Sequence, residues 1–261
     1  MDFSIIVPCY NESLNLATLA DAFHHALGNT PGVEVLLVNN GSTDDSAVHL
    51  QSICNNPRYA FIRPVEVTRN QGYGFGILSG LANARGEYLA WTHADLQTDP
   101  KDVMVGWQKL LASSDPKRSI VRGVRSGRPM VDVAFTHAMG TFASFALGTS
   151  LFDINAQPKI FHRSFLEQLG AAPFDFALDL YVLYLAKRLG YQSIELPVHF
   201  GRRIAGIAKG GGSLCGKWKL CKRTLGYIMQ LRSELKSSRA NAIAFQPIHF
   251  ISSECRIQKA A

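Results

Sequence analysis

The chain has 261 residues, of which 47% are hydrophobic and 18% are charged. This composition excludes an intrinsically disordered or fibrous protein, and the length suits one large α/β domain with an appendage or two small domains. The net charge of +7 comes from one segment, because residues 1–200 carry 15 Lys and Arg against 18 Asp and Glu, whereas residues 201–236 carry nine against one.

The first hundred residues alternate between apolar runs and segments with helical spacing. Strands are predicted at 3–7, 33–38, 61–67 and 88–92, and a helix is predicted after each of the first three. Strands and helices in this order form a parallel sheet with helices on both faces. The predicted fold class is therefore α/β, with a mostly parallel sheet.

Polar loops follow three of these strands, at residues 8–12, 39–44 and 93–100. The carboxyl ends of parallel strands meet at one edge of a sheet, which is where open α/β sheets bind ligands. We therefore expect the three loops to build one pocket.

The third loop contains a possible cation site. His93, Asp95 and Gln97 occupy alternate positions, which share one face in an extended chain. A carboxylate, an amide oxygen and an imidazole can hold a divalent cation that carries a diphosphate. The alternative is a polar turn before the next helix, which Asp99 and Pro100 would begin.

Four motifs follow one another along the chain. They are Val7-Pro8-Cys9-Tyr10-Asn11-Glu12, Asn39-Asn40-Gly41-Ser42-Thr43-Asp44, Arg69-Asn70-x-Gly72 and Ala94-Asp95-Leu96-Gln97-Thr98-Asp99-Pro100. Together they resemble the family 2 glycosyltransferases, which have a GT-A fold. The last motif is most similar to the branch that transfers sugars to polyprenyl (dolichol) phosphate. The resemblance covers roughly residues 1–210.

This resemblance implies an inverting, metal-dependent transferase with a nucleotide-sugar donor. Asp95, assisted by Gln97, would bind the cation, Mg²⁺ or Mn²⁺. The residues implied for the nucleotide-sugar are Pro8, Tyr10, Asn11, Glu12, Asn39, Asn40, Ser42, Asp44, Asn70, Gly72, Ala94 and Asp95.

Two residues depart from the family pattern. The family commonly has a carboxylate where Asn39 or Asn40 stands, and an amide both donates and accepts hydrogen bonds, so the nucleobase is not predicted. The family often has Asp at the position of His93. The loss of that negative charge would weaken Mg²⁺ binding or favour a softer ion.

Three arginines follow at regular spacing, in and after a predicted strand near residue 120. Arginine binds phosphate in bidentate geometry, so Arg122 and Arg125 are candidates for a donor or acceptor phosphate. Arg125 falls where the resembled branch has a phosphate-binding arginine. The alternative is an exposed basic loop.

Residues 134–152 contain no Asp, Glu, Lys or Arg, but their Ser, Thr, Gly and His137 make a poor membrane span. A core or interfacial helix pair that faces a lipid carrier is expected.

Asp179, at the start of a predicted helix, lies where the family places an acidic acceptor-site residue. Transfer to a hydroxyl needs a general base, whereas an ionised phosphate acceptor needs none. The alternative is a carboxylate that the helix dipole favours. Asp153 and Asp175 are weaker candidates for the base.

The predicted last strand, at 194–200, is followed by Arg202, Arg203 and Lys209 and then by three glycines. This segment resembles the family's mobile loop, in which an Arg and a Lys close over the phosphates. Cations there would stabilise the charge that develops on the leaving diphosphate, and Arg203 is the catalytic candidate.

Residues 213–236 are predicted to form a basic amphipathic helix that either lies on an anionic membrane surface or packs on the body in solvent. The expected organisation is a GT-A domain at 1–212, this helix, and a tail at 237–261 without a motif. The five cysteines are odd in number and include no C-x-x-C pair, so reduced thiols in a cytoplasmic protein are expected.

The motifs together predict sugar transfer from a nucleotide-sugar to an acceptor. The favoured acceptor is a polyprenyl phosphate at the cytosolic face of a membrane. Three alternatives are a transferase with a glycan or other hydroxyl acceptor, a non-catalytic nucleotide-sugar binder, and a nucleic-acid-binding module. The last is disfavoured because the basic segment has few aromatic residues for stacking on bases.

Overall fold

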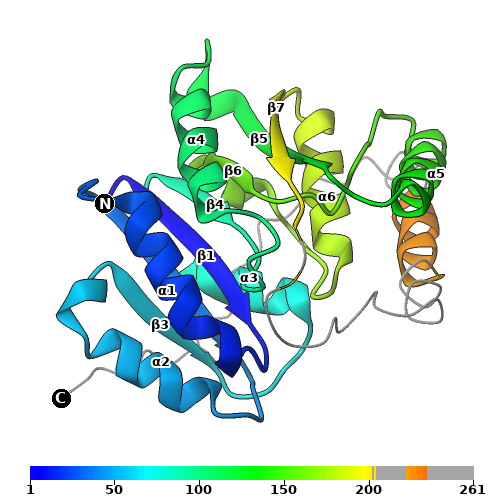
Figure 1. Ribbon diagram of the computed structural model, residues 1–261. Helices are drawn as coiled ribbons and strands as arrows, with labels where there is room; N and C mark the ends of the chain where they lie inside the picture. Colours follow the sequence, from blue (N-terminus) through cyan, green and yellow to red (C-terminus); the bar gives the residue numbers. More distant parts are fainter. Residues whose placement is uncertain (202, 204–221, 234–261) are drawn as a thin grey trace.

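The computed structural model describes residues 1–201, 203 and 222–233. The described residues form one sheet in the order β3-β2-β1-β4-β6-β5-β7 (Figure 1). All neighbouring strands are parallel except at β6, which is antiparallel to β4 and to β5. The strands are β1 Phe3–Cys9, β2 Val33–Asn40, β3 Ile62–Val67, β4 Tyr88–Trp91, β5 Ser119–Ser126, β6 Lys159–His162 and β7 Gln192–His199.

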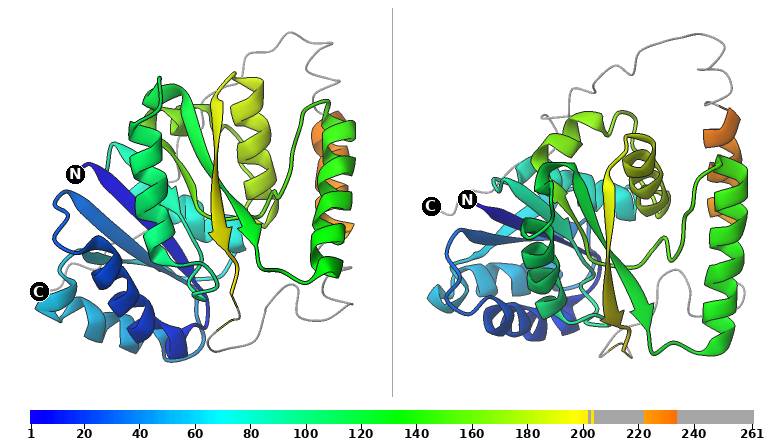
Figure 2. Two further views of the ribbon diagram at one scale, coloured as in Figure 1. Left: turned by 45° about the horizontal axis from the view of Figure 1, so that its top comes forward. Right: turned by 90° about the horizontal axis from the view of Figure 1, so that it is seen from above.

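Helices cover both faces of the sheet, as predicted (Figures 1 and 2). One apolar layer joins the sheet to α1, α2 and α4, and a second joins it to α3 and α6. The helices are α1 Ser13–Leu27, α2 Ser46–Cys54, α3 Tyr73–Asn83, α4 Pro100–Leu111, α5 Met130–Leu147 and α6 Ala177–Arg188, with 3₁₀ segments η1 Pro57–Tyr59, η2 Pro116–Arg118 and η3 Arg163–Gln168.

Two local features orient the loops at the carboxyl ends of the strands. The side chain of Asp99 accepts a hydrogen bond from the N–H of Lys101, and Pro100 is the first residue of α4. Gly41 has φ +67°, and a Cβ there would lie 2.3 Å from the backbone nitrogen of Asn70. Only glycine fits this close approach of two loops at a left-handed position.

Helix α5 stands beside the sheet and belongs to neither covering layer (Figure 2). It packs against α6 and against a helix at residues 222–233 through a third apolar cluster. The prediction of a helix pair within 134–152 was wrong, because α5 is one continuous helix. The helix that packs against it comes from the basic segment. The rest of the predicted basic helix and the tail lie outside the described residues.

Candidate functional site

A cavity of about 660 Å³ opens at the carboxyl ends of the parallel strands. This volume lies in the range of small-molecule sites, which is roughly 300–1,000 Å³. One half is lined by residues of the first three polar loops and of the turn before α3, and all of these were predicted: Pro8, Tyr10, Glu12, Asn40, Asn70, Gly72, Ala94 and Asp95.

Arg203, directly after β7, crosses this half of the cavity. Its guanidinium donates to Asp95 Oδ2 at 2.8 Å and to Glu12 Oε1 at 3.4 Å. Both carboxylates have side chains that are almost buried, with exposed fractions of 11% and 12%. Arg203 therefore joins the loops after β1 and β4 to the chain after β7, beside the predicted metal ligand.

The loop that carries Asp95 is bent, which corrects the geometry expected from the sequence. Strand β4 ends at Trp91, and Leu96 has φ +55°, so residues 93–97 are not extended. His93, Asp95 and Gln97 nevertheless all line the cavity. Hydrogen bonds hold the bend: Gln97 N donates to Asp95 Oδ1 at 3.2 Å, and Gln97 Nε2 donates to the carbonyl of Gly201 at 3.1 Å.

Four other residues predicted for the donor, Asn11, Asn39, Ser42 and Asp44, do not line the cavity. They connect neighbouring loops to one another. Asn11 N donates to Ser42 Oγ at 3.0 Å, and Ser42 N donates to Asn39 Oδ1 at 3.2 Å. The Asn39 amide donates to Glu66 Oε2 at 2.8 Å. The backbone groups of a loop need hydrogen-bond partners, and these side chains supply them.

Asp44 is part of the same framework. Its carboxylate accepts hydrogen bonds from the N–H of Ser13 at 3.2 Å and from the N–H of Ser46 at 3.0 Å. These residues are the first of α1 and α2. Burial would raise the pKa of Asp44, but the hydrogen bonds from Ser46 and Ser13 lower it to about 2.

Within the described part of the chain, three non-glycine residues have a left-handed backbone, and each lies in a loop that borders the cavity. They are Asn11, Leu96 and Asp153, with φ of 53°, 55° and 42°. Such conformations cost roughly 1–3 kcal/mol each and gather at ligand sites, where the surrounding structure holds them in place.

The floor of the cavity contains a buried charged network. Asp179 is 1% exposed and accepts hydrogen bonds from Trp91 Nε1 at 3.1 Å and from Gln157 Nε2 at 2.8 Å. The fully buried Lys159 lies 3.7 Å from the same carboxylate oxygen and donates to two backbone carbonyls. Burial lowers the pKa of Lys159 to about 8, although Asp179 opposes the shift.

His93 is also desolvated. Burial lowers its pKa, against the attraction of the carboxylates of Asp95 and Asp179, so the imidazole is neutral at pH 7. Its ring lies 5.9 Å from that of Tyr73, which stacks on Phe176 with ring centroids 4.8 Å apart. Tyr73 and Phe176 line the cavity and were not predicted. No local pattern pairs residues so far apart in the chain.

The second half of the cavity combines cations with apolar groups. Arg125 and Arg128 line it, and both are ion-paired with Asp153. Burial would raise the pKa of Asp153, but the hydrogen bonds and charge of Arg125 lower it. The remaining side chains on this half come from α5, from the loops before β6 and α6, from the residue after β7 and from the helix at 222–233: Asp132, Phe135, Thr136, Met139, Ile154, Asn155, Asp175, Phe200, Arg223 and Thr224.

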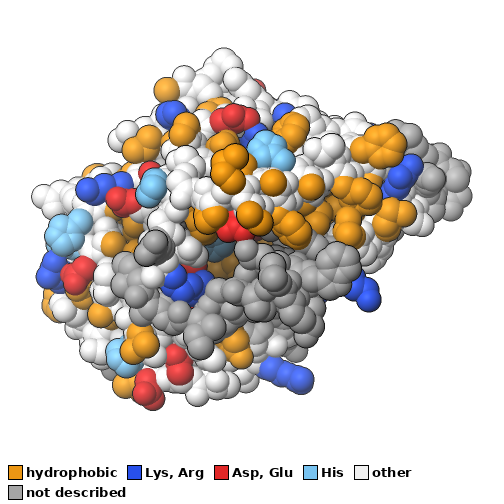
Figure 3. Space-filling model, turned by 45° about the vertical axis from the view of Figure 1, so that its right-hand side comes forward, with side chains coloured by type: hydrophobic (Ala, Val, Ile, Leu, Met, Phe, Trp, Pro, Cys, Tyr) orange, Lys and Arg blue, Asp and Glu red, His pale blue; other side chains and the backbone are white. Residues whose placement is uncertain are grey.

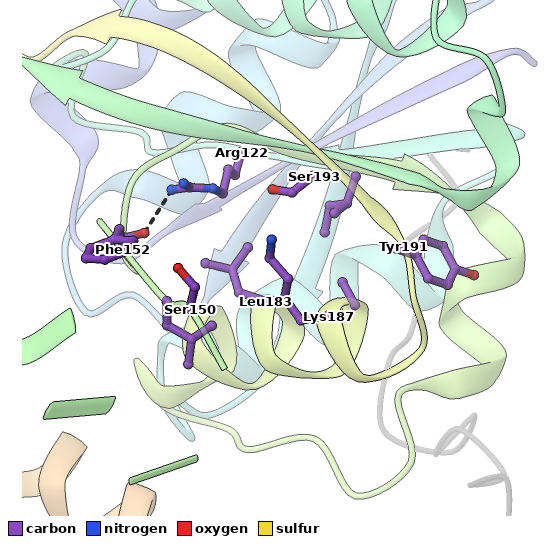
Figure 4. A pocket seen from close by; sticks show the side chains of 10 residues that line it. Arg122, Ser150, Phe152, Leu183, Lys187, Tyr191 and Ser193 are labelled. Atoms are coloured by element: carbon purple, nitrogen blue, oxygen red, sulfur yellow. Dashed lines mark hydrogen bonds between the residues drawn. The ribbon is translucent and has the colours of Figure 1, made fainter. Parts of the chain in front are cut away.

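Arg122, predicted as a phosphate ligand, lies elsewhere. Its side chain bonds to the carbonyl of Phe152 and to Glu195, at a small cavity between the sheet and α6 (Figure 4). That cavity holds about 10 Å³, roughly the space of one water molecule. Arg125 lines the large cavity, whereas Arg122 lines only the small one. Arg202 and Lys209 lie outside the described residues.

The described residues contain no group of three or more His, Cys, Asp and Glu side chains that could hold a metal by themselves. Asp95 and Gln97 provide one carboxylate and one amide on the cavity wall. Magnesium in phosphate-transferring sites is commonly bound by one or two carboxylates together with substrate phosphates. The two residues therefore fit a cation that arrives with a diphosphate.

The sequence of the chain is similar to a family model and to known transferases. The family model described as Glycosyl transferase family 2 matches residues 4–170. The undecaprenyl-phosphate 4-deoxy-4-formamido-L-arabinose transferase of Enterobacter sp. is 27% identical over 213 residues, which are 79% of this chain and 62% of that protein. The chain thus spans less than two thirds of this relative's length. The polyprenol monophosphomannose synthase of Mycolicibacterium smegmatis is 26% identical over 80% of this chain and 81% of its own.

Solved structures support the same fold. Glucosyl-3-phosphoglycerate synthase from Mycobacterium tuberculosis, in complex with Mn²⁺, UDP and glucosyl-3-phosphoglycerate, superposes with a TM-score of 0.67. The match covers 88% of this chain and 79% of that one, at 17% identity.

Proposed function

The chain belongs to glycosyl transferase family 2, and on this premise we propose that it transfers a sugar from a nucleotide-sugar to a polyprenyl phosphate. The reaction would take place at the cytosolic face of a membrane. The observation that carries the proposal is that one continuous cavity contains the carboxylate of Asp95, the arginines of its second half and residues of α5.

The donor fits the first half. Pro8, Tyr10, Asn40 and Asn70 offer stacking surface and amide groups for a base and ribose, and Asp95 lies beside them for the diphosphate. A structural neighbour binds UDP with Mn²⁺, which supports a nucleoside diphosphate and a divalent cation here as well.

The acceptor fits the second half. Arg125, Arg128 and Arg223 can bind a phosphate, and Phe135 and Met139 of α5 can contact a hydrocarbon chain. The names of several relatives refer to undecaprenyl phosphate, polyprenol and dodecaprenyl phosphate. A lipid phosphate combines the two kinds of surface that this half presents.

The chemistry follows from these positions. An oxygen of the acceptor phosphate forms a bond to the anomeric carbon, while the bond from that carbon to the diphosphate oxygen breaks and its electron pair leaves with the nucleoside diphosphate. Attack from the face opposite the leaving group inverts the configuration. A phosphate is already ionised at pH 7, so no base is required.

Arg203 would stabilise the leaving diphosphate, for which its guanidinium must turn from Asp95 and Glu12 towards the phosphates. A divalent cation held by Asp95 and Gln97 would neutralise charge on the same group. Asp179 already bonds to Trp91 and Gln157 and faces the Lys159 ammonium, so we propose that it maintains the cavity floor. Its role as a base applies to a hydroxyl acceptor.

The test uses the purified full chain with radiolabelled nucleotide-sugars, polyprenyl phosphate in vesicles, and Mg²⁺, Mn²⁺ or EDTA. We expect nucleoside diphosphate release and lipid-extractable label only with a divalent cation. Asp95→Asn should lower the rate by about a hundredfold or more, the size of effect seen when one transition-state contact is removed. The matched control is Asp45→Asn, whose side chain makes no cap hydrogen bond and should leave the rate unchanged.

Other outcomes select the alternatives. Label transferred to a glycan and not to the lipid would identify a hydroxyl acceptor. Binding of nucleotide-sugars without turnover would identify a non-catalytic binder. Full activity of Asp95→Asn would contradict the proposed role of the carboxylate.

A further inference from the structure

Helix α5 exposes large apolar side chains along one side. Val131, Phe135, Phe142 and Phe145 have exposed fractions of 74%, 43%, 41% and 83%, and Ala138 between them is exposed too. Their spacing is close to two helical turns per seven residues, so all five lie on one face. We call this the outer face of α5.

The opposite side of α5 is made of small residues. Gly140, Ala143 and Ala146 are the buried residues of the helix, and they pack towards α6 and the helix at 222–233. A surface helix of a soluble protein normally buries its large apolar residues and exposes polar ones. Helix α5 instead exposes large apolar side chains and buries small ones, which indicates that its outer face has an apolar surrounding in the working protein.

The outer face carries no charge. In the described residues α5 is the one helix long and apolar enough to cross a membrane by length and composition, with a mean hydropathy of 1.2. The C-terminal half of α5 packs against the helix at 222–233 (Figure 2). A helix with one protein-covered side and one apolar side suits a position in the plane of a membrane interface.

Basic residues lie on the helix that packs against the protein-facing side of α5. This helix, at 222–233, carries Lys222, Arg223 and Arg232 and no acidic residue, and the side chain of Arg223 is 61% exposed. Figure 3 shows hydrophobic side chains gathered on the side of the molecule that carries α5. Cations attract an anionic lipid surface, which favours a membrane over a protein partner without charge complementarity.

The outer face is also continuous with the cavity, because Phe135 belongs to both. Thr136 and Met139 of the next turn line the cavity as well. A hydrocarbon chain can therefore pass from this face into the half of the cavity that contains Arg125 and Arg128.

We propose that the outer face of α5 inserts into the hydrocarbon boundary of an anionic bilayer and places the arginine half of the cavity at the membrane surface. The membrane contact stands on the exposed apolar face alone, whereas its purpose, access to a lipid acceptor, rests on the proposed function. The helix at 222–233, the described part of the basic segment expected from sequence to contact a membrane or the body, then supplies cations on the helix packed against α5.

The test is flotation of the full chain with vesicles of phosphatidylcholine and phosphatidylglycerol. Replacing Phe142 and Phe145 by Glu should reduce the vesicle-bound fraction by about tenfold or more, because two apolar side chains that would be buried in lipid become charged. Val48→Glu on α2, where the valine is 66% exposed, is the matched control and should float like the parent. Circular dichroism and thermal unfolding establish that each variant is folded.

A second measurement places the helix in the bilayer. Phe145→Trp should gain fluorescence that brominated lipids quench, beyond any quenching of the parent's own tryptophans. Equal flotation of the parent and the double variant would overturn the inference. A parent that does not float and is dimeric in solution, with a monomeric double variant, would assign the face to contacts between copies.

Activity separates this inference from the proposed function. Neither Phe142 nor Phe145 lines the cavity, so the double variant should keep its rate with a short, water-soluble prenyl phosphate and lose about tenfold with a long-chain acceptor in vesicles. Flotation without any turnover would count against the transferase and leave the membrane contact standing. Turnover without flotation would count against the membrane contact and leave the transferase assignment standing.

Discussion

His93 stands beside Asp95 on the cavity wall and is neutral at pH 7, because burial lowers the pKa of its imidazole. The cation site therefore has one negative side chain in this loop. Each protein charge within a few ångströms of a divalent cation contributes strongly to its binding. If the proposed cation binds here, the residue at position 93 should affect its affinity.

We predict that His93→Asp tightens Mg²⁺ binding. A second carboxylate should lower the half-saturating Mg²⁺ concentration about tenfold, which corresponds to roughly 1.4 kcal/mol. Calorimetric titration of Mg²⁺ in the presence of UDP measures this without turnover, and the rate at limiting Mg²⁺ provides a second readout. His49→Asp, at an exposed position on α2, is the control. Weaker Mg²⁺ binding in His93→Asp would contradict the assignment.

At the scale of elements, the loops of the site depend on how the first helices begin. The carboxylate of Asp44 bonds to the first N–H groups of both α1 and α2. These groups have no partner within their own helices, and the positive ends of the helix dipoles favour an anion there. Asp44 therefore maintains the relative position of two cavity loops without touching the ligand.

We predict that Asp44→Ala lowers the free energy of unfolding by about 1 kcal/mol at pH 7, a usual cost for a lost cap. The folded pKa of Asp44, about 2, is below the ordinary value of 3.8. Its contribution is therefore complete above pH 4 and is lost as the pH falls towards 2. Urea unfolding at pH 7 and pH 3 measures the difference between parent and variant. A difference that grows on acidification would refute this account.

At the scale of the whole molecule, ligands should stabilise the fold because the cavity joins loops from distant parts of the chain. At a hundred times Kd, a ligand adds about 2.7 kcal/mol to the stability of the state that binds it. For a chain of this size we expect a rise in Tm of roughly 5–10 °C. A thermal-shift screen of UDP and GDP with Mn²⁺ measures it, and Asp95→Asn should reduce the part of the shift that needs Mn²⁺. No shift with any nucleoside diphosphate would speak against the donor half.

The sequence by itself determined the family, the class of fold and most of the residues that line the first half of the cavity. Apolar runs at the strands and short motifs at their carboxyl ends are local features, and parallel strands necessarily bring such loops to one edge. The family predicted from the motifs is confirmed by the family model, and the α/β fold is confirmed by the structure.

The tertiary structure decided which of those residues face the cavity. Asn39, Ser42 and Asp44 bond to other loops, and Arg122 lines a separate small cavity whereas Arg125 lines the large one. Three further features became visible only in three dimensions. They are the stack of Tyr73 on Phe176, the antiparallel strand β6 and the exposed apolar face of α5. The reason is physical: direction, burial and pairing depend on partners far away in the chain, and no short stretch of sequence contains them.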